Sequence, residues 1–426
     1  MAGIALAHGL PLVGETLWGT VFVVAAAGTA AATTVPCLRP YTLPPLLIAV
    51  MALGALLNRH ADPRYDSRHW QRLCNDKAII ELHLDDTPVR RERSYRVPAT
   101  VLGIDGHRCR GTMTLYLRPD STAATLRYGD RLLIHGYPDT LRHTLYTTHD
   151  HYLLTARDST SLRARSEALR QRLLRRMRQG PLDPSCLGVA AAMALGWRGN
   201  LQHDMQSHYR DAGVVHLLCV SGLHVGLLAA MVGWLLFFTG RTQRGRIVRG
   251  ALQLAVVWAF ALLSGLAPAT VRAALMFSLF IVSHALGRRT NGLNLMAFSA
   301  IAMLVAKPML LFDVGWQLSY SAVAGLLIAQ PWLRRLRLGV VQTAAASLAA
   351  TLATMPVTVT VFHRLTPYFL VANILLVPLA GLLLALSLAY AALPCGFTAL
   401  PLQLLVSGCN WLVAGIATLP CAVIPL

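Results

Sequence analysis

Long apolar segments separated by short polar turns dominate the chain. Two such segments open it, and eight more follow residue 185. They cover residues 10–35, 41–58, 214–239, 247–266, 269–286, 293–310, 314–331, 338–361, 368–392 and 400–423. Because a helix needs about 20 mostly apolar residues to cross a bilayer, the pattern predicts a polytopic α-helical membrane protein with about ten spans. The apolar stretch at 186–197 is too short to cross, so we expect a re-entrant or interfacial segment there.

Residues 59–157 follow a different pattern, in which apolar and polar residues alternate over short runs. The runs typical of strands are 78–84, 94–104, 111–117, 131–137 and 151–156. Turn-forming pairs such as Asp105-Gly106 and Gly129-Asp130 separate them. Five short strands over about 80 residues predict a small β-barrel, with an OB-like fold as the natural candidate. An unspecific β-sandwich is the alternative.

Residues 159–179 predict a basic amphipathic helix. Its apolar side chains can share one face, opposite the arginines; they are Leu162, Leu169, Leu173, Leu174 and Met177. This pattern is typical of an interfacial helix lying on a membrane surface, and an arm that grips nucleic acid is the alternative. The chain thus divides into an N-terminal transmembrane hairpin (1–58), a β domain (59–157), this helix (158–184) and a large transmembrane domain (185–426).

Arginines in short loops predict the orientation in the membrane. The loops at 241–249, 288–289 and 334–337 are rich in arginine, which indicates a cytoplasmic position for each. They alternate correctly if every intervening segment crosses once, and counting back places residues 59–185 on the outer side. The N-terminus lacks a basic region followed by a small-residue cleavage site, so we interpret it as a span and not as a cleaved signal.

The charge balance limits what could pass through such a bundle. The chain is 55% hydrophobic and 13% charged with a net charge of +19, and all but two of its 38 basic residues are arginine. Beyond Asp183 the only acidic residues are Asp204, Asp211 and Asp313. A water-filled path there would have positive or neutral walls, which suits an anionic polymer. Coding bias in a GC-rich genome would explain the arginines equally well.

Several polar residues fall inside the predicted spans, where such groups usually face a bundle interior or a water-filled cavity. The segment GVVHLLCVSGLHVG at 213–226 is the most unusual of these spans. The candidates are His216, Ser221, Gly222, His224, Arg272, Asp313, Gln317 and Asn373. Structural interpretations compete with functional ones: histidines and amides can bond between helices, and Gly222 and Gly226 have the GxxxG spacing of packed helices. Arg272 and Asp313 could also pair with each other.

Signals of catalysis or of a cofactor are weak. Ser221 and His224, three residues apart, could act as nucleophile and base, but no GxSxG elbow accompanies them. No Walker A motif is present, and the eight scattered cysteines lack zinc-binding spacing, so we expect neither a cofactor nor a metal. Cys74 and Cys109, the only cysteines of the β domain, could pair if that domain lies outside the cytoplasm.

Four stretches, taken in order, resemble the competence domain of the ComEC family. They are HLLCVSGLHVG (216–226), LLSGLAPATVRAALM (262–276), LFDVGWQLSYSAVAGL (311–326) and PVTVTVFHRLTPYFLVANILLVPLAG (356–381). The 60–157 region is similar to the family's external OB-like domain. Many members continue into a C-terminal metallo-β-lactamase-like domain, whereas this sequence ends at Leu426 without an HxHxDH-type run. We therefore expect either a natural short form or a truncated chain, and in both cases no nuclease activity from this polypeptide.

The resemblance implies a channel in the bacterial inner membrane that passes single-stranded DNA into the cytoplasm during natural transformation. The implied partners are single-stranded DNA, membrane lipids, a DNA receptor and a cytoplasmic helicase or single-strand-binding protein. An Arg-rich barrel can track a DNA backbone and stack bases on aromatic rings. The external candidates are Arg96, Arg108, Arg110, Tyr116, Arg118, Tyr128 and Arg131. An ordinary solvated basic face is the competing interpretation of these residues.

Two other functions stay open on the sequence alone. A secondary transporter of a smaller anionic metabolite would bind at broken helices near the middle of the membrane and would show internal repeats, of which none is clear. An intramembrane hydrolase would use Ser221 and His224, and its activity would depend on the Ser221 hydroxyl.

Overall fold

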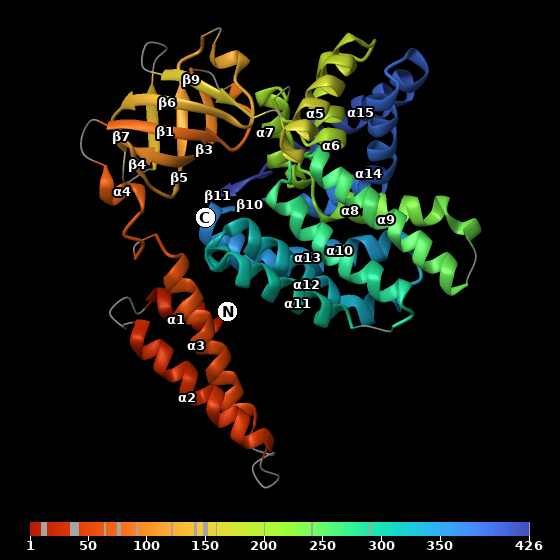
Figure 1. Cartoon of the computed structure of the whole chain (residues 1–426). Coiled ribbons are helices and arrows are strands. Elements are labelled where there is room, and N and C mark those ends of the chain that lie inside the picture. The colour runs from red at the N-terminus through yellow and green to blue at the C-terminus, as the bar shows by residue number, and fades with distance from the viewer. Residues whose placement is uncertain are drawn as a thin grey trace. The chain divides into compact units, whose positions relative to one another are not determined.

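The computed structural model of the chain divides into two compact units (Figure 1). One comprises residues 1–157 with 300–316, and the other comprises residues 158–299 with 317–426. The structure describes residues 1–9, 15–34, 42–63, 65–74, 78–90, 93–120, 122–139, 143–147, 152–158, 160–199, 201–239, 242–288 and 291–425. Arg241 and Arg289, which contributed to the predicted orientation, lie outside these residues.

The first unit begins with three helices, α1 (Ala2–Gly9), α2 (Glu15–Thr34) and α3 (Leu43–Ala61). Both α1 and α2 pack against α3. Prolines in the first turn of α3 favour its start there, because the first backbone N–H groups of a helix have no intrahelical acceptor. A short helix, α4 (Trp70–Leu73), leads into the β domain.

The β domain is a mixed sheet in which most neighbouring strands are antiparallel. Its described strands are β1 (Ala78–Leu84), β2 (Val89–Arg90), β3 (Tyr95–Ile104), β4 (His107–Arg108), β5 (Thr112–Leu117), β6 (Asp130–Gly136), β7 (Pro138–Asp139), β8 (Thr144–Thr147) and β9 (Tyr152–Arg157). The main path runs β7-β8-β5-β3-β1-β6-β9, and β2 and β4 pair with β3. Only β5 and β8 run parallel among the described pairs.

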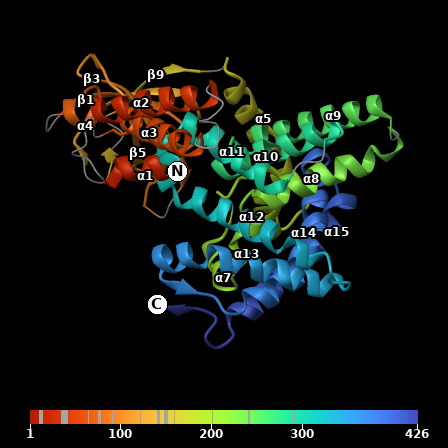
Figure 2. The ribbon, with the colours of Figure 1, turned by 90° about the horizontal axis from the view of Figure 1, so that it is seen from below.

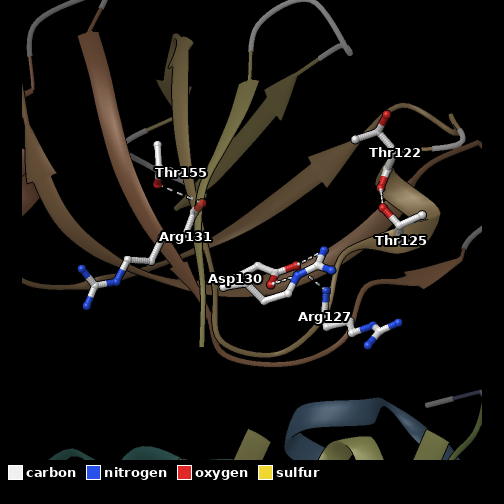
Figure 3. Close-up of polar contacts among 7 residues, drawn as sticks. Thr122, Thr125, Arg127, Asp130, Arg131 and Thr155 are labelled. Carbon is white, nitrogen blue, oxygen red and sulfur yellow. Dashed lines mark hydrogen bonds and ion pairs between the residues drawn. The ribbon is translucent and has the colours of Figure 1, made fainter. Parts of the chain in front are cut away.

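Alternation of apolar residues explains where these strands lie. In β1, Ala78, Ile80, Leu82 and Leu84 are buried, and the residues between them are more exposed. The buried side chains of all the longer strands form one core with Trp70, which is fully buried. Asp130 is also fully buried, and its carboxylate accepts hydrogen bonds from the Arg157 side chain and the Arg127 backbone (Figure 3).

The five predicted strands correspond to β1, β3, β5, β6 and β9, but the predicted closed barrel is wrong for the described strands. Their path has two ends, at β7 and β9, and no pairing joins these ends within the described residues. The physical reason lies at β6, whose two edges are occupied by β1 and β9. β8 pairs instead with β7, which follows β6 after Tyr137.

The second unit is helical, apart from the two-stranded pair β10 (Arg364–Leu365) and β11 (Ile424–Pro425). Its helices are α5 (Leu162–Gln179), α6 (Pro184–Leu195), α7 (His203–Asp211), α8 (Gly222–Leu235), α9 (Gln243–Leu263), α10 (Pro268–Ala285), α11 (Gly292–Ala306), α12 (Val314–Leu333), α13 (Gly339–Phe362), α14 (Phe369–Ala392) and α15 (Gly396–Ala417); α11 and α12 extend into the segment 300–316 of the first unit. Helices α8, α9 and α10 pack against one another (Figure 2).

Seven described helices are long and apolar enough to cross a membrane, so the chain is a multi-pass membrane protein. They are α2, α3, α9, α10, α13, α14 and α15. The described residues thus give seven candidate spans where about ten were predicted. Helices α8 and α11 have 14 and 15 residues, and each falls short of the roughly 30 Å hydrocarbon core at about 1.5 Å per residue. Helix α12 is longer but carries Gln317, Ser319 and Tyr320.

The basic helix α5 packs on the helical bundle through part of the face that its apolar residues predict: Leu174 and Met177 are buried, and Leu173 packs against the same core. It contacts α6, α9 and α14, whereas Leu162 and Leu169 are 66% and 49% exposed. Its buried face includes Glu167 and Arg170, which form an ion pair with each other. Because each charge neutralises the other, the pair can be buried where either group alone could not.

Helix α6 is the most deeply enclosed element of this unit. Every residue from Cys186 to Leu195 is buried, as expected for a helix that is apolar on all sides. It packs against α14 and α15, and the Cys186 sulfur lies 3.4 Å from the Ser407 hydroxyl. The segment predicted to be re-entrant or interfacial is therefore a core helix of the bundle.

Candidate functional site

The histidine-rich segment 213–226 forms a broken helix in the structure. Helix α7 ends at Asp211, and the backbone turns at Gly213, whose φ is +77°. A 3-10 turn, η4 (Val215–Leu218), is followed by extended residues up to Ser221, and α8 then begins at Gly222. A Cβ on Gly213 would lie 2.7 Å from the Phe369 Cβ, so glycine is required there for space as well as for conformation.

Ser221 and His224 lie at the first turn of α8. The Ser221 hydroxyl is 3.1 Å from the His224 Nδ1, and this bond takes the place of a cap to the helix backbone. The His224 side chain is fully buried, and its Nε2 has no hydrogen-bond partner within the described residues. His216 is exposed on η4 and lies within electrostatic range of His224. Ser221 and His224 are thus bonded to each other where the helix is interrupted.

Gly222 and Gly226 bring α8 close to α10. A Cβ on Gly222 would lie 3.8 Å from the Ala273 Cβ, and one on Gly226 would lie 2.7 Å from the Phe277 ring. Small residues allow membrane helices to approach in this way. Arg272, the neighbour of Ala273 in the sequence, therefore lies on the helix that packs against α8.

Arg272 is 3% exposed and lies within electrostatic range of Tyr320 on α12. The Tyr320 hydroxyl is 3.2 Å from that of Ser299 on α11. Asp313 is exposed, and its carboxylate accepts the Trp316 backbone N–H at 2.6 Å, which caps the start of α12. Arg272 and Asp313 belong to different units, so their pairing stays a prediction.

Unsatisfied polar atoms surround α8. The structure leaves His224 Nε2, Thr270 Oγ1 and Asn373 Oδ1 without hydrogen-bond partners in its described part, although all three residues are buried. They lie on α8, α10 and α14, and α8 packs against both other helices. Buried polar atoms of native proteins are nearly always bonded, so this group requires an explanation such as water or a ligand. Thr270 was absent from the sequence candidates because threonine is common in membrane helices.

The β domain carries a second candidate site, a pocket of about 530 Å³. Its lining residues are Arg93, Ser94, Tyr116, Leu117, Arg118, His135, Gly136, Tyr137, Tyr146 and Thr147. The rings of Tyr116 and Tyr146 stack with centroids 4.8 Å apart and an interplanar angle of 11°. Arginine and tyrosine therefore gather at one end of the sheet.

Two of the seven external candidates, Tyr116 and Arg118, line this pocket. Arg96 pairs with Tyr116 across β3 and β5, so it lies on the same face beside the pocket. The structure does not bring the other four there. Arg108 is on β4, and the Arg110 carbonyl accepts the Trp70 backbone N–H.

Tyr128 and Arg131 lie near the opposite end of β6 from the pocket. The Tyr128 ring meets His83 edge-on, and Arg131 pairs with His83 in the sheet. Five residues separate Arg131 from Gly136 in the pocket, a distance of about 17 Å along a strand. Figure 3 shows the Arg131 side chain extended away from Asp130, while its carbonyl accepts a hydrogen bond from Thr155.

Sequence reasoning missed Arg93, His135, Tyr137 and Tyr146 as pocket residues. Tyr146 lies on β8, a four-residue strand that was not predicted because TLYT is short and mostly polar. The alternation of buried Leu145 and Thr147 with exposed Tyr146 is the signal that could have indicated it.

Cys74 and Cys109 both belong to the β domain, and whether they pair stays a prediction. Cys109 is buried near the base of the sheet's core, with Cys74 packed against the same cluster. Burial, and to a smaller extent the nearby Cys74 thiol, raises the pKa of the Cys109 thiol to about 11. Among the described residues, no group of three or more histidine, cysteine or acidic side chains could hold a metal ion.

These features define a multi-pass membrane protein with a β domain and a broken, histidine-containing helix in its bundle. The family described as "Competence protein" matches residues 193–426, which is more than half of the chain. The chain belongs to this competence protein family.

Curated relatives agree with the family. ComE operon protein 3 of Bacillus subtilis (strain 168) is 30% identical over 247 residues, covering 55% of this chain and 31% of the relative. Competence protein ComA of Neisseria gonorrhoeae is 30% identical over 168 residues, covering 38% and 24%. YcaI of Escherichia coli (strain K12) is 26% identical over 204 residues, covering 45% and 27%.

The chain spans less than a third of the length of these curated relatives. No solved structure matches the chain.

Proposed function

We propose that this chain acts in DNA uptake during natural transformation and contributes the membrane path by which single-stranded DNA enters the cytoplasm. The observation that carries the proposal is the group of buried, unsatisfied polar atoms around the broken helix at 213–226. Interrupted helices in a membrane are tolerated where they are buried in protein or line water. This helix lies within the segment that matches the competence protein family.

The charge of the bundle supports an anionic substrate. Only three acidic residues follow Asp183, and none is glutamate. Arg272 places a positive charge beside the α8 and α10 contact, and a phosphodiester backbone carries one negative charge for each nucleotide. A path with this charge pattern attracts DNA and excludes cations.

The β domain is proposed to lie on the outer side of the bacterial inner membrane and to receive DNA there. The arginine-rich loops support this orientation if residues 214–239, a segment longer than α8 itself, cross the membrane once. The tyrosine and arginine pocket supports contact with nucleic acid. An OB-like arrangement remains part of the proposal; it is supported by a central β1 paired with β3 and β6, and by the parallel pairing of β5 with β8. A DNA receptor outside and a helicase or single-strand-binding protein inside are the proposed partners.

The test is entry of labelled DNA into cells that carry variants of this protein. Thr270→Val is the sharpest variant, because Thr270 Oγ1 makes no hydrogen bond within the described residues and valine keeps its shape. We expect it to keep the fold and to slow entry, as we expect of His224→Ala. A polar group worth about 1–3 kcal/mol to the moving strand would change the rate by about fivefold to a hundredfold.

The matched control is His284→Ala, since His284 is an exposed histidine near the end of α10. Surface-bound DNA should stay unchanged in all three strains. If Thr270→Val and His224→Ala admit DNA at the same rate as His284→Ala, the proposed path does not pass this cluster.

One observation favours a second candidate function, intramembrane hydrolysis: the 3.1 Å contact between Ser221 and His224 Nδ1. Within the described residues, no carboxylate hydrogen-bonds to His224 to orient it as in a catalytic triad. Ser221→Ala separates the two functions. Loss of turnover of a lipid or peptide substrate supports the hydrolase, whereas loss of DNA entry without any such turnover supports the path.

A further inference from the structure

We propose that the pocket of the β domain binds one unpaired nucleotide, with the base against Tyr146 and the phosphate on Arg93 and Arg118. The inference rests on the proposed function for the source of the nucleotide, a DNA strand outside the cell. The kind of ligand, a nucleotide, is inferred from the pocket alone and does not depend on the proposed function. It adds Arg93, His135, Tyr137 and Tyr146 to the residues that face DNA.

The fold creates the pocket where several strands terminate together. Leu117, the last residue of β5, pairs with Tyr95 at the start of β3 and with Thr147 at the end of β8. Arg93 and Ser94 directly precede β3, and Arg118 directly follows β5. The Arg118 backbone N–H donates to the Thr147 carbonyl at 3.2 Å, which holds the two strand ends together.

A stacking platform forms one side of this pocket. Tyr116 and Tyr146 are neighbours in the parallel pair of β5 and β8, and their rings stack nearly parallel to each other. Tyr116 covers one face of the Tyr146 ring, yet Tyr146 remains 64% exposed, so its outer face is open. Tyr137 adds a second ring that is also 64% exposed. Flat aromatic surfaces of this kind stack on bases of any sequence.

The polar lining suits the phosphate of the same nucleotide. Arg93 and Arg118 are exposed at the pocket, His135 is a third basic group, and none of the ten lining residues is acidic. A guanidinium group binds phosphate oxygens through two parallel hydrogen bonds. The volume of about 530 Å³ falls within the range of sites for small ligands.

The pocket should discriminate against double-stranded DNA. A base in a duplex is already stacked on both faces, and it must leave the helix before it can reach Tyr146. A single strand or a frayed end presents a base without that cost. We therefore expect affinity in the order single strand, frayed end, blunt duplex.

The test is binding of fluorescent oligothymidylate to the whole chain in detergent, over a series of salt concentrations. Tyr146→Ala should weaken binding about fivefold to a hundredfold, and Tyr146→Phe, which keeps the ring, should bind as the original chain does. Arg118→Ala should lower the slope of log affinity against log salt by about one. Within the described residues the hydrogen bond of Arg118 comes from its backbone, so this variant should remain folded.

Arg127→Ala is the matched control, because Arg127 is an exposed arginine of the same domain that does not line the pocket. If Tyr146→Ala and Arg118→Ala bind oligothymidylate as Arg127→Ala does, the pocket assignment is overturned. It is also overturned if these two variants change binding to anionic lipid vesicles and leave oligothymidylate binding intact. Thymidine monophosphate that competes as well as the oligomer would assign the pocket to free nucleotides.

Binding and entry separate the two proposals. Loss of oligothymidylate binding in Tyr146→Ala with normal DNA entry in Thr270→Val would support the pocket and remove the path. Normal binding in Tyr146→Ala with impaired entry in Thr270→Val would support the path and remove the pocket.

Discussion

At the scale of single residues, Cys109 shows how burial controls chemistry in the β domain. Burial raises its pKa from 9.0 to about 11, so at pH 8 only about one thiol in a thousand is ionised. We predict that it is alkylated at least about a hundredfold more slowly than the exposed Cys421, with the rate rising about tenfold per pH unit toward pH 11. Mass spectrometry after timed iodoacetamide treatment measures both rates.

The same residue makes the β domain sensitive to alkali. Folded Cys109 keeps its proton between pH 9 and about 11, where an unfolded cysteine loses it, so stability should fall as the pH rises through this range. Cys109→Ala should lack this fall. If Cys109 is modified only after reduction, it is paired, and the expected disulfide with Cys74 becomes the explanation.

Residue types in the sequence indicated some residues of each candidate site. Others could not be predicted, because they reach the site only through contacts between segments that are distant in the sequence. Tyr116 and Arg118 were predicted, but Tyr146 reaches Tyr116 only because β8 pairs in parallel with β5. Such a pairing between distant segments leaves no local pattern in the sequence. Thr270 was missed for a different reason, since only the surroundings of its hydroxyl show that it lacks a partner.

At the scale of elements, the packing of α12 on α13 gives a direct test of helix contact. A Cβ on Gly325 would lie 2.5 Å from the Ala353 Cβ and 2.7 Å from the Ala349 carbonyl oxygen, and a backbone atom cannot move aside as a side chain can. We predict that Gly325→Ala destabilises the bundle by about 1–3 kcal/mol. Thermal unfolding in detergent should show a lower midpoint.

Gly408 on α15 is the matched control, because it is exposed and a Cβ there would meet nothing within 4 Å. Gly408→Ala should be neutral or stabilise by up to about 1 kcal/mol, since alanine is the better helix former. Equal midpoints for the two variants would contradict the close approach of α12 and α13.

Elements with a strong periodic pattern were predicted well, and interruptions were not. The alternation in β1, β3, β5, β6 and β9 indicated their positions within a few residues. The apolar run at 214–239 predicted one span, but the turn at Gly213 and the extended residues before Ser221 break it. For α5, the predicted apolar face is buried at Leu174 and Met177 but exposed at Leu162 and Leu169. The burial of Glu167 and Arg170 was not predicted, because it depends on the matching of their charges.

At the scale of the whole molecule, the β domain has a hydrophobic core of its own. All the members of this core lie between Trp70 and Tyr152. We therefore predict that residues 59–157 fold as an isolated fragment. Trp70 is the only tryptophan in this range and is fully buried, so its fluorescence should shift to longer wavelength in one cooperative step on urea unfolding. A red-shifted spectrum without urea would show that the fragment needs the rest of the chain.

The enclosure of α6 has a consequence for how the chain is made. At 12 residues α6 is too short to stay in a bilayer by itself, and its neighbours α14 and α15 are synthesised some two hundred residues later. During translation α6 therefore has only its contacts with α5 and η4, and most of its apolar surface stays exposed until nearly the whole chain has left the ribosome. Nascent chains halted before α14 should expose α6 to proteases and chaperones, and release of the last two helices should end that exposure.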